Sequence, residues 1–109
     1  MPRHLHHRVY VIELDPRVWA ESRPFRTDNP QRDPAKPCLY VGSTGLPIAE
    51  RFANHLAGYR SSRFVTKYGR KLRPDLWEGL EPMTYAAAEK MERVLAYQLR
   101  ADGYGVWQR

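Results

Sequence analysis

Arg51 and His55 are the first residues whose types and spacing suggest chemistry. They follow the strand-like segment Leu39–Val41, which carries Tyr40. At about 100° per residue of helix, both side chains fall on one flank of an apolar face, which is formed by Ile48, Phe52 and Leu56. A guanidinium, an imidazole and a phenol are groups that bind anions and transfer protons. We therefore expect Tyr40, Arg51 and His55 to meet at the rim of a core.

Glu92 is the carboxylate that we expect to face the interior. The segment 84–102 is the clearest predicted helix, with Thr84 as its N-cap and Gly103 as its stop. On a helical wheel Glu92 lies roughly 45° from the centre of the apolar arc and Glu89 roughly 105° from it. The arc is formed by Ala88, Met91, Leu95 and Leu99. A buried carboxylate needs a cation or a hydrogen-bond donor. Glu92 is therefore expected either to pair with Arg51 or to hold a metal ion, and spacing alone favours the pair.

Two short strands must position the tyrosines. Val9–Leu14 (VYVIEL) is rich in β-branched and aromatic residues and predicts a strand that carries Tyr10. Leu39–Val41 predicts a second strand, which we expect Gly42 to end. Antiparallel pairing of the two strands would bring Tyr10 close to Tyr40.

The remaining segments complete an expected order of β-β-α-α-β-α. Five prolines in the segment 16–37 exclude a central strand and make a long helix improbable, so residues 15–37 are predicted to form an inserted surface loop. A helix is expected up to Gly58, a shorter one over Ser61–Tyr68, and an edge strand near Leu76–Leu80. These elements predict a mixed α/β (α+β) fold with a small three-stranded, antiparallel or mixed β-sheet flanked by helices.

Length and composition favour one small globular domain. The 109 residues, 42% of them apolar, suit a single two-layer domain that spans residues 1–109. The single cysteine, Cys38, excludes an internal disulfide and lies in an apolar run, where it is expected to be buried. No stretch approaches the roughly 20 apolar residues that cross a bilayer. We expect a soluble, cytoplasmic protein without a membrane partner.

The positive charge is concentrated in one segment. Between Arg51 and Arg73 there are seven Lys or Arg residues and no acidic residue, whereas the rest of the chain has a net charge of minus one. Such a run is as compatible with a solvated face as with nucleic-acid binding. Aromatic residues among the cations favour binding somewhat, because they can stack bases. The candidate binding residues are Arg60, Arg63, Lys67, Arg70, Lys71 and Arg73.

These residues together resemble the GIY-YIG nuclease superfamily over nearly the whole chain. The resemblance is carried by Tyr10 in RVYV, by the sequence Tyr40-Val41-Gly42, by Arg51 and His55 spaced R-x3-H on the next helix, and by a glutamate on a late helix. Arg8 and Val9 stand where the family has Gly-Ile, and a long proline-containing segment separates the two tyrosines. The order of elements agrees with that family's three-stranded antiparallel sheet packed between helices.

The resemblance implies hydrolysis of DNA phosphodiester bonds, on single or double strands, by a monomer or homodimer. One Mg²⁺ or Mn²⁺ ion would be held by Glu92, Tyr10 would deprotonate the attacking water and Arg51 would contact the scissile phosphate. His55 would take up the proton of Tyr10, and Tyr40 would position the water or a phosphate. Two other classes remain open: a catalytically inactive nucleic-acid-binding module on the same scaffold, and a small interaction protein whose basic face is only solvated.

Overall fold

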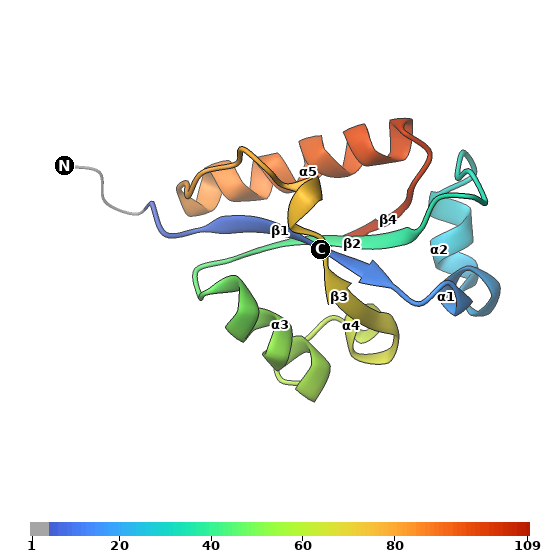
Figure 1. Cartoon of the computed structure of the whole chain (residues 1–109), viewed down its shortest axis with the longest axis horizontal. Helices are drawn as coiled ribbons and strands as arrows, with labels where there is room; N and C mark the ends of the chain where they lie inside the picture. Colours follow the sequence, from blue (N-terminus) through green and yellow to red (C-terminus); the bar gives the residue numbers. More distant parts are fainter. Residues whose placement is uncertain (1–4) are drawn as a thin grey trace.

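A four-stranded mixed sheet separates the helices into two groups in the computed structural model, which describes residues 5–109. Helix α5 covers one face of the sheet, and α3 and α4 cover the other (Figure 1). The mixed α/β class predicted from the sequence is confirmed. The elements in chain order are β1 (Arg8–Leu14), α1 (Arg17–Glu21), α2 (Arg23–Asp28), β2 (Cys38–Thr44), α3 (Ile48–Ala57), α4 (Arg63–Tyr68), β3 (Gly69–Leu72), a 3₁₀ turn η1 (Pro74–Leu76), α5 (Tyr85–Ala101) and β4 (Gly105–Gln108).

Strand β1 lies in the middle of the fold and is buried on both faces. Its alternate residues Val9 and Val11 pack under α5, while Tyr10, Ile12 and Leu14 face the opposite side of the sheet. A strand turns successive side chains to opposite faces, so a run without solvent-facing polar residues can supply two cores. The sequence therefore predicted this strand correctly, and the structure extends it by one residue to Arg8.

Strands β1 and β2 pair antiparallel, as expected, with Tyr10 opposite Gly42 and Ile12 opposite Tyr40. The rings of Tyr10 and Tyr40 lie 6.4 Å apart between their centroids. The prediction that Gly42 ends the strand is wrong, because β2 continues to Thr44. A Cβ atom on residue 42 would lie 2.8 Å from the hydroxyl of Tyr10 and 3.0 Å from the ring of Tyr40. The glycine is therefore needed for the close approach of the two tyrosines.

The two edges of the sheet differ from the prediction. Instead of a strand near Leu76–Leu80, the chain forms η1 and a turn there, and the edge strand is β3, which pairs antiparallel with β1. A fourth strand, β4, was not predicted and runs parallel to β2. Both edge strands have four residues, and β3 (GRKL) has no β-branched side chain. The strand propensity of β3 is therefore weak, and its pairing with β1 holds it in the sheet.

The proline-containing segment is a loop only in part: residues 29–37 lie outside helices and strands, as the sequence predicts, whereas the residues before them form the short helices α1 and α2. Pro16 and Pro24 fall at the starts of these helices, where the missing N–H is not needed. Val18 and Phe25 are fully buried in the core. Asn29 is also fully buried; its amide donates to the carbonyls of Phe25 (2.8 Å) and Val106 (3.1 Å) and accepts from the Val106 N–H (2.8 Å). These hydrogen bonds hold the proline-containing segment against β4.

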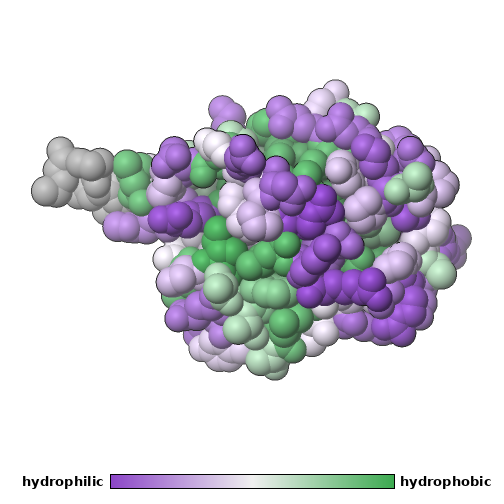
Figure 2. All heavy atoms as spheres, in the orientation of Figure 1, coloured by the Kyte–Doolittle hydropathy of each residue, from purple (hydrophilic) through white to green (hydrophobic). Residues whose placement is uncertain are grey.

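The helices on the two faces differ in how well the sequence predicted their buried sides. Helix α5 starts at the expected N-cap, where Thr84 accepts from the N–H of Ala87 (3.1 Å). Helix α3 ends at Gly58 in the left-handed conformation, also as expected. Its buried side, however, is centred on His55, while Leu56 is 46% exposed. In the face shown in Figure 2, hydrophobic residues gather over α3 and hydrophilic ones cover the end that carries α1 and α2.

None of the described helices is both long enough and apolar enough to cross a membrane.

Candidate active site at the open edge of strand β2

A hydrogen bond between Tyr10 and His55 forms the centre of the candidate site. The tyrosine hydroxyl lies 2.8 Å from Nε2 of His55, and both residues are almost completely buried. The ring of Tyr40 lies edge-on to His55, with 5.5 Å between the ring centroids. Strands β1 and β2 supply the tyrosines and helix α3 supplies the histidine. The structure thus brings together three of the residues that the sequence singled out.

The neighbours of His55 determine which of its nitrogens carries the proton. The backbone N–H of Ser62 donates to Nδ1 over 3.2 Å, so Nδ1 is the unprotonated nitrogen of the neutral ring. The N–H at Nε2 therefore donates to the oxygen of Tyr10. Burial, followed by the positive charges of Arg51 and Arg109, lowers the pKa of His55 from 6.5 to about 4, which keeps the ring neutral near pH 7.

This arrangement does not fit the expected role of His55 as acceptor of the Tyr10 proton. Nε2 already carries a proton and the lone pair of Nδ1 is used by the Ser62 N–H. His55 is instead a donor that stabilises negative charge on the phenol oxygen. Sequence reasoning missed Ser62, whose contact with the ring exists only because the turn after α3 folds back.

Both tyrosines are protonated in this environment. Burial raises the pKa of Tyr10 to about 12, although the charges of Arg51 and Arg109 act in the opposite direction. Burial raises the pKa of Tyr40 well above its usual range as well. A phenol of this kind is a weak acid, and the two arginines and the His55 N–H are the groups that make its ionisation less costly.

Arg51 is held by the turn that follows its own helix. Its guanidinium donates to the carbonyl of Arg60 over 2.7 Å and more weakly to that of Tyr59 over 3.5 Å. Arg60 adopts a left-handed conformation (φ 47°), which turns its carbonyl back towards α3. Two cavities meet at Arg51: one of about 370 Å³ beside Tyr40 and one of about 510 Å³ beside Ser43. Donors of the guanidinium that the carbonyls leave unused can bind an anion there.

Glu92 faces inward, as predicted, but not as the partner of Arg51. The carboxylate is 2% exposed and accepts a hydrogen bond from the hydroxyl of Ser43. No ion pair joins it to Arg51 within residues 5–109, so the favoured structural pair is wrong. Burial raises the pKa of Glu92, and the Ser43 hydroxyl and the charge of Arg109 oppose that rise. At the position of Glu92 the sheet lies between α5 and α3, so this carboxylate does not reach Arg51.

Residues from both faces of the sheet line one cavity at the open edge of β2. Strand β4 pairs with β2 only as far as Val41 opposite Gln108, which leaves 42–44 without a neighbouring strand on that side. Ser43, which holds Glu92 on the α5 face, lines the same cavity of about 510 Å³ as Arg51 from the opposite face. The catalytic candidates therefore surround one edge of the sheet.

Arg109 is the cation that sequence reasoning missed. Its guanidinium donates to the carbonyl of Ser43 (3.2 Å) and lines both cavities together with Arg51. Its positive charge opposes the rise in the pKa of Tyr10 and of Glu92 that burial causes, and it adds to the lowering of the pKa of His55. No local pattern indicates it, because β4 carries it to the site and β4 itself was not predicted.

Comparisons of the chain with models of known protein families, with curated proteins and with solved structures found no match. The likeness to GIY-YIG nucleases therefore stays a prediction from the quoted residues. Any function must be inferred from the geometry and chemistry of the site.

Glu92 offers a divalent cation a single carboxylate. No group of three or more His, Cys, Asp or Glu side chains that would hold a metal gathers within the described residues. Mg²⁺, however, commonly binds through one or two carboxylates and keeps water and substrate phosphate as its other ligands. One Ser43 hydroxyl leaves most of the acceptor capacity of the Glu92 carboxylate unused. The positive charge of Arg109 also attracts the Glu92 carboxylate. The carboxylate and a bound phosphate would therefore share two cations, Arg109 and the metal ion.

The basic segment divides into two groups in the structure. Arg60, Arg63 and Lys67 line cavities on the α3–α4 side. Arg70 and Arg73 lie near or on β3 and are paired with acids: Arg70 with Asp15 (3.5 Å), and Arg73 with Glu13 and Asp75 (2.8 Å each). Lys71 is exposed on the same edge strand. The first group has more charge free for a phosphate chain than the second.

Proposed function

We propose that the protein is a metal-dependent endonuclease that hydrolyses phosphodiester bonds of DNA. The observation that carries the proposal is the Tyr10–His55 hydrogen bond, set between two arginines at the open edge of β2, with the Glu92 carboxylate behind the same edge. Arg51, Arg109 and Ser43 line one cavity, the buried Glu92 is bonded to Ser43, and the buried Tyr10 is bonded to His55. A phenol, two guanidiniums and a carboxylate in these positions match the needs of phosphodiester hydrolysis, which are a base, charge compensation and a cation ligand.

Arg51 and Arg109 bind the scissile phosphate in this proposal. Both line the two cavities, and a planar guanidinium can grip two phosphate oxygens at once. Their fixed positive charge also compensates the charge that develops as water attacks phosphorus.

Glu92 is the residue that would hold Mg²⁺ or Mn²⁺. When bound, the ion supplies a Lewis acid for the phosphate and the leaving 3′ oxygen. The Ser43 hydroxyl orients the carboxylate, and the short β4 leaves the edge of the sheet open beside it.

Tyr10 removes the proton of the attacking water after losing its own proton to solvent. His55 donates to the phenol oxygen and so stabilises the phenolate without itself changing charge. Because the pKa of Tyr10 is raised to about 12, only a small fraction of the protein carries the phenolate near neutral pH. The rate is accordingly expected to rise with pH.

The decisive test is cleavage of a labelled pool of mixed DNA oligonucleotides in Mg²⁺, in Mn²⁺ and in chelator. We expect cleavage in the presence of the metal ions only. Glu92→Ala should abolish it while leaving DNA binding, and Glu89→Ala is the matched control, since Glu89 lies three positions earlier on α5 and bonds only to the exposed Tyr85 hydroxyl (3.0 Å).

Two results would overturn the proposal. Binding of the pool without cleavage in any metal ion would identify the chain as a nucleic-acid-binding module. Loss of activity in Glu89→Ala with full activity in Glu92→Ala would move the metal ligand from Glu92 to the half-buried Glu89 beside Tyr85.

A further inference from the structure

A cavity between α2 and α4 lies outside the candidate active site. Its volume is about 430 Å³, within the range of roughly 300–1,000 Å³ that is usual for small-molecule sites. The start of α2 contributes Arg23, and α4 contributes Arg63 and Lys67. Phe64 and Tyr68 add aromatic walls. The combination of cations with aromatic rings is that of a site for a phosphate and a base.

The charge of this cavity is not neutralised from within. Its single acid, Glu21, accepts a hydrogen bond from the Tyr68 hydroxyl (2.6 Å) and pairs loosely with Lys67 (3.7 Å). Arg23 and Arg63 have no ion pair with any described residue. An anionic ligand would therefore meet two exposed, uncompensated guanidiniums.

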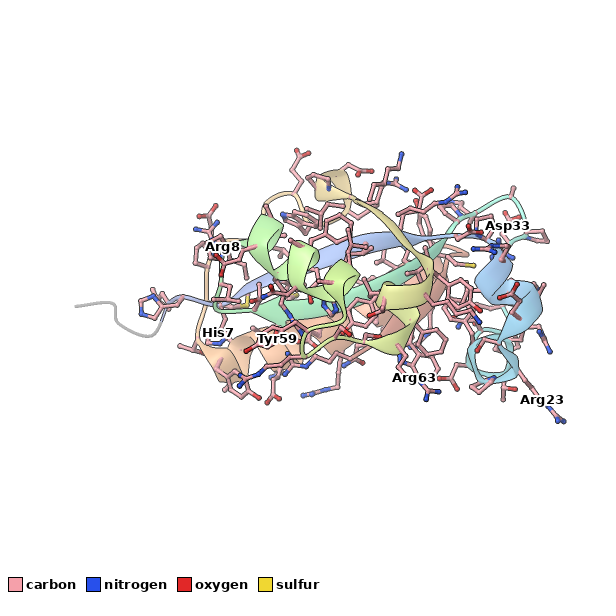
Figure 3. All side chains as sticks on the ribbon, turned by 90° about the horizontal axis from the view of Figure 1, so that it is seen from below. His7, Arg8, Arg23, Asp33, Tyr59 and Arg63 are labelled. Atoms are coloured by element: carbon pink, nitrogen blue, oxygen red, sulfur yellow. The ribbon has the colours of Figure 1, made fainter. Side chains whose placement is uncertain are left out.

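Shared lining residues connect this cavity to the active site. Arg63 and Lys67 also line a neighbouring cavity of about 440 Å³, which contains Ser61. Ser61 in turn lines the cavity beside Tyr40 and Arg51. Figure 3 shows the same direction along the long axis of the molecule, where His7, Tyr59, Arg63 and Arg23 follow one another in that order.

An aromatic pair joins the two ends. Phe64 from the α2–α4 cavity packs against Trp107, with ring centroids 4.5 Å apart, and Trp107 lines the cavity beside Tyr40. Aromatic rings accept the flat faces of unpaired bases with little regard to sequence, while nearby cations follow the phosphates.

We propose that the cavity between α2 and α4 is a second subsite for the DNA strand that the active site cuts, and that it holds a phosphate and an unpaired base some nucleotides away from the scissile bond. The inference rests on the proposed nuclease function and adds the substrate class, an extended single strand. The insertion that carries α2 thereby acquires a role in substrate binding.

The test measures binding of labelled oligothymidylates of about 4, 8 and 16 nucleotides, which span the site sizes of known single-strand grooves. Metal-free full-length protein is compared with Arg23→Ala, which removes an exposed cation that has no ion pair with any described residue. Arg93→Ala is the matched control, because it removes the same charge from the exposed side of α5. Single-turnover cleavage of each oligonucleotide in Mg²⁺ is measured in parallel.

We expect the wild-type protein to bind the longest oligonucleotide much more tightly than the shortest. Arg23→Ala should bind the longest oligonucleotide roughly tenfold more weakly than wild type does. Its slope of log affinity against log salt should also be flatter by about 0.7, the value for one phosphate contact on a single strand. Its binding and cleavage of the shortest oligonucleotide should match wild type, and Arg93→Ala should match wild type at every length.

Three outcomes would overturn the subsite: no gain in affinity with length, an equal gain in Arg23→Ala, or equal losses in Arg23→Ala and Arg93→Ala. Failure of the nuclease proposal is a different result, because absent cleavage with a preserved, Arg23-dependent gain would leave the strand-binding subsite in place.

Discussion

Acidification should destabilise this protein through His55. The folded chain binds a proton at His55 only near pH 4, because burial and the charges of Arg51 and Arg109 disfavour the imidazolium, whereas the unfolded chain binds it at a pKa of 6.5. Between these values the unfolded state carries more protons, so the free energy of unfolding must fall as pH falls. Above about pH 6.5 the ring is neutral in both states and this contribution is fully present.

The size of the effect follows from the two pKa values. A pKa that differs by one between the folded and unfolded states corresponds to about 1.4 kcal/mol, so lowering the pH from about 7 to about 4.5 should remove about 2–3 kcal/mol of stability through this residue alone. That is a large part of the roughly 5–15 kcal/mol that stabilises a typical small domain. Acidic groups with lowered pKa values, such as Asp15 and Asp75, add to the loss at lower pH.

A matched variant separates His55 from those acids. In His55→Gln the side-chain amide keeps a donor for Tyr10 and an acceptor for the Ser62 N–H but does not titrate. Urea unfolding, followed by the fluorescence of the three tryptophans, is measured at several pH values for both proteins. The stability difference between wild type and variant should shrink by about 2–3 kcal/mol on acidification. Parallel pH profiles would refute the buried, neutral histidine and the hydrogen-bond assignment built on it.

Four further results are expected. Arg51→Lys should cost far more turnover than binding, because an ammonium cannot satisfy the turn carbonyls and grip a phosphate together; steady-state kinetics beside a binding titration would show this, and full activity would mean that charge alone suffices. Gly42→Ala should lower stability by about 1–3 kcal/mol in denaturant and reduce cleavage by pushing on the Tyr10 hydroxyl, so a neutral effect would contradict the close approach. The single-turnover rate should rise nearly tenfold per pH unit across neutral pH and lose that dependence in Tyr10→Phe, since the pKa of Tyr10 is about 12; a flat wild-type profile would exclude this tyrosine as the base. Arg60→Ala should flatten the salt dependence of DNA binding by about 0.7 per lost phosphate contact, whereas the paired Arg73, replaced by Ala, should leave that slope unchanged and lower the unfolding midpoint.

The sequence by itself was sufficient wherever one periodic pattern decides which side of an element is buried. Strand β1 alternates between two apolar faces, and the apolar arc of α5 has the inward phase that places Glu92 in the interior. The antiparallel pairing of β1 with β2 was expected from two consecutive strand signals, although the proline-containing segment separates them, and the structure confirms it. The proximity of Tyr10 to Tyr40 was therefore predictable without coordinates.

Only the tertiary structure decided the rest, because the deciding contacts come from segments far apart in the chain. Helix α3 buries His55 in preference to Leu56, since Tyr10 and the Ser62 N–H satisfy both ring nitrogens and make a polar residue tolerable in the core. The sheet edges are set by pairing partners, which is why β3 and β4 were missed, and Arg109 was missed together with β4. The count of charges did not distinguish the residues of the basic segment from one another. Apart from Asp75, which is two residues from Arg73, their acidic partners Glu13, Asp15 and Glu21 lie far away in the sequence, so no local pattern indicates those pairs.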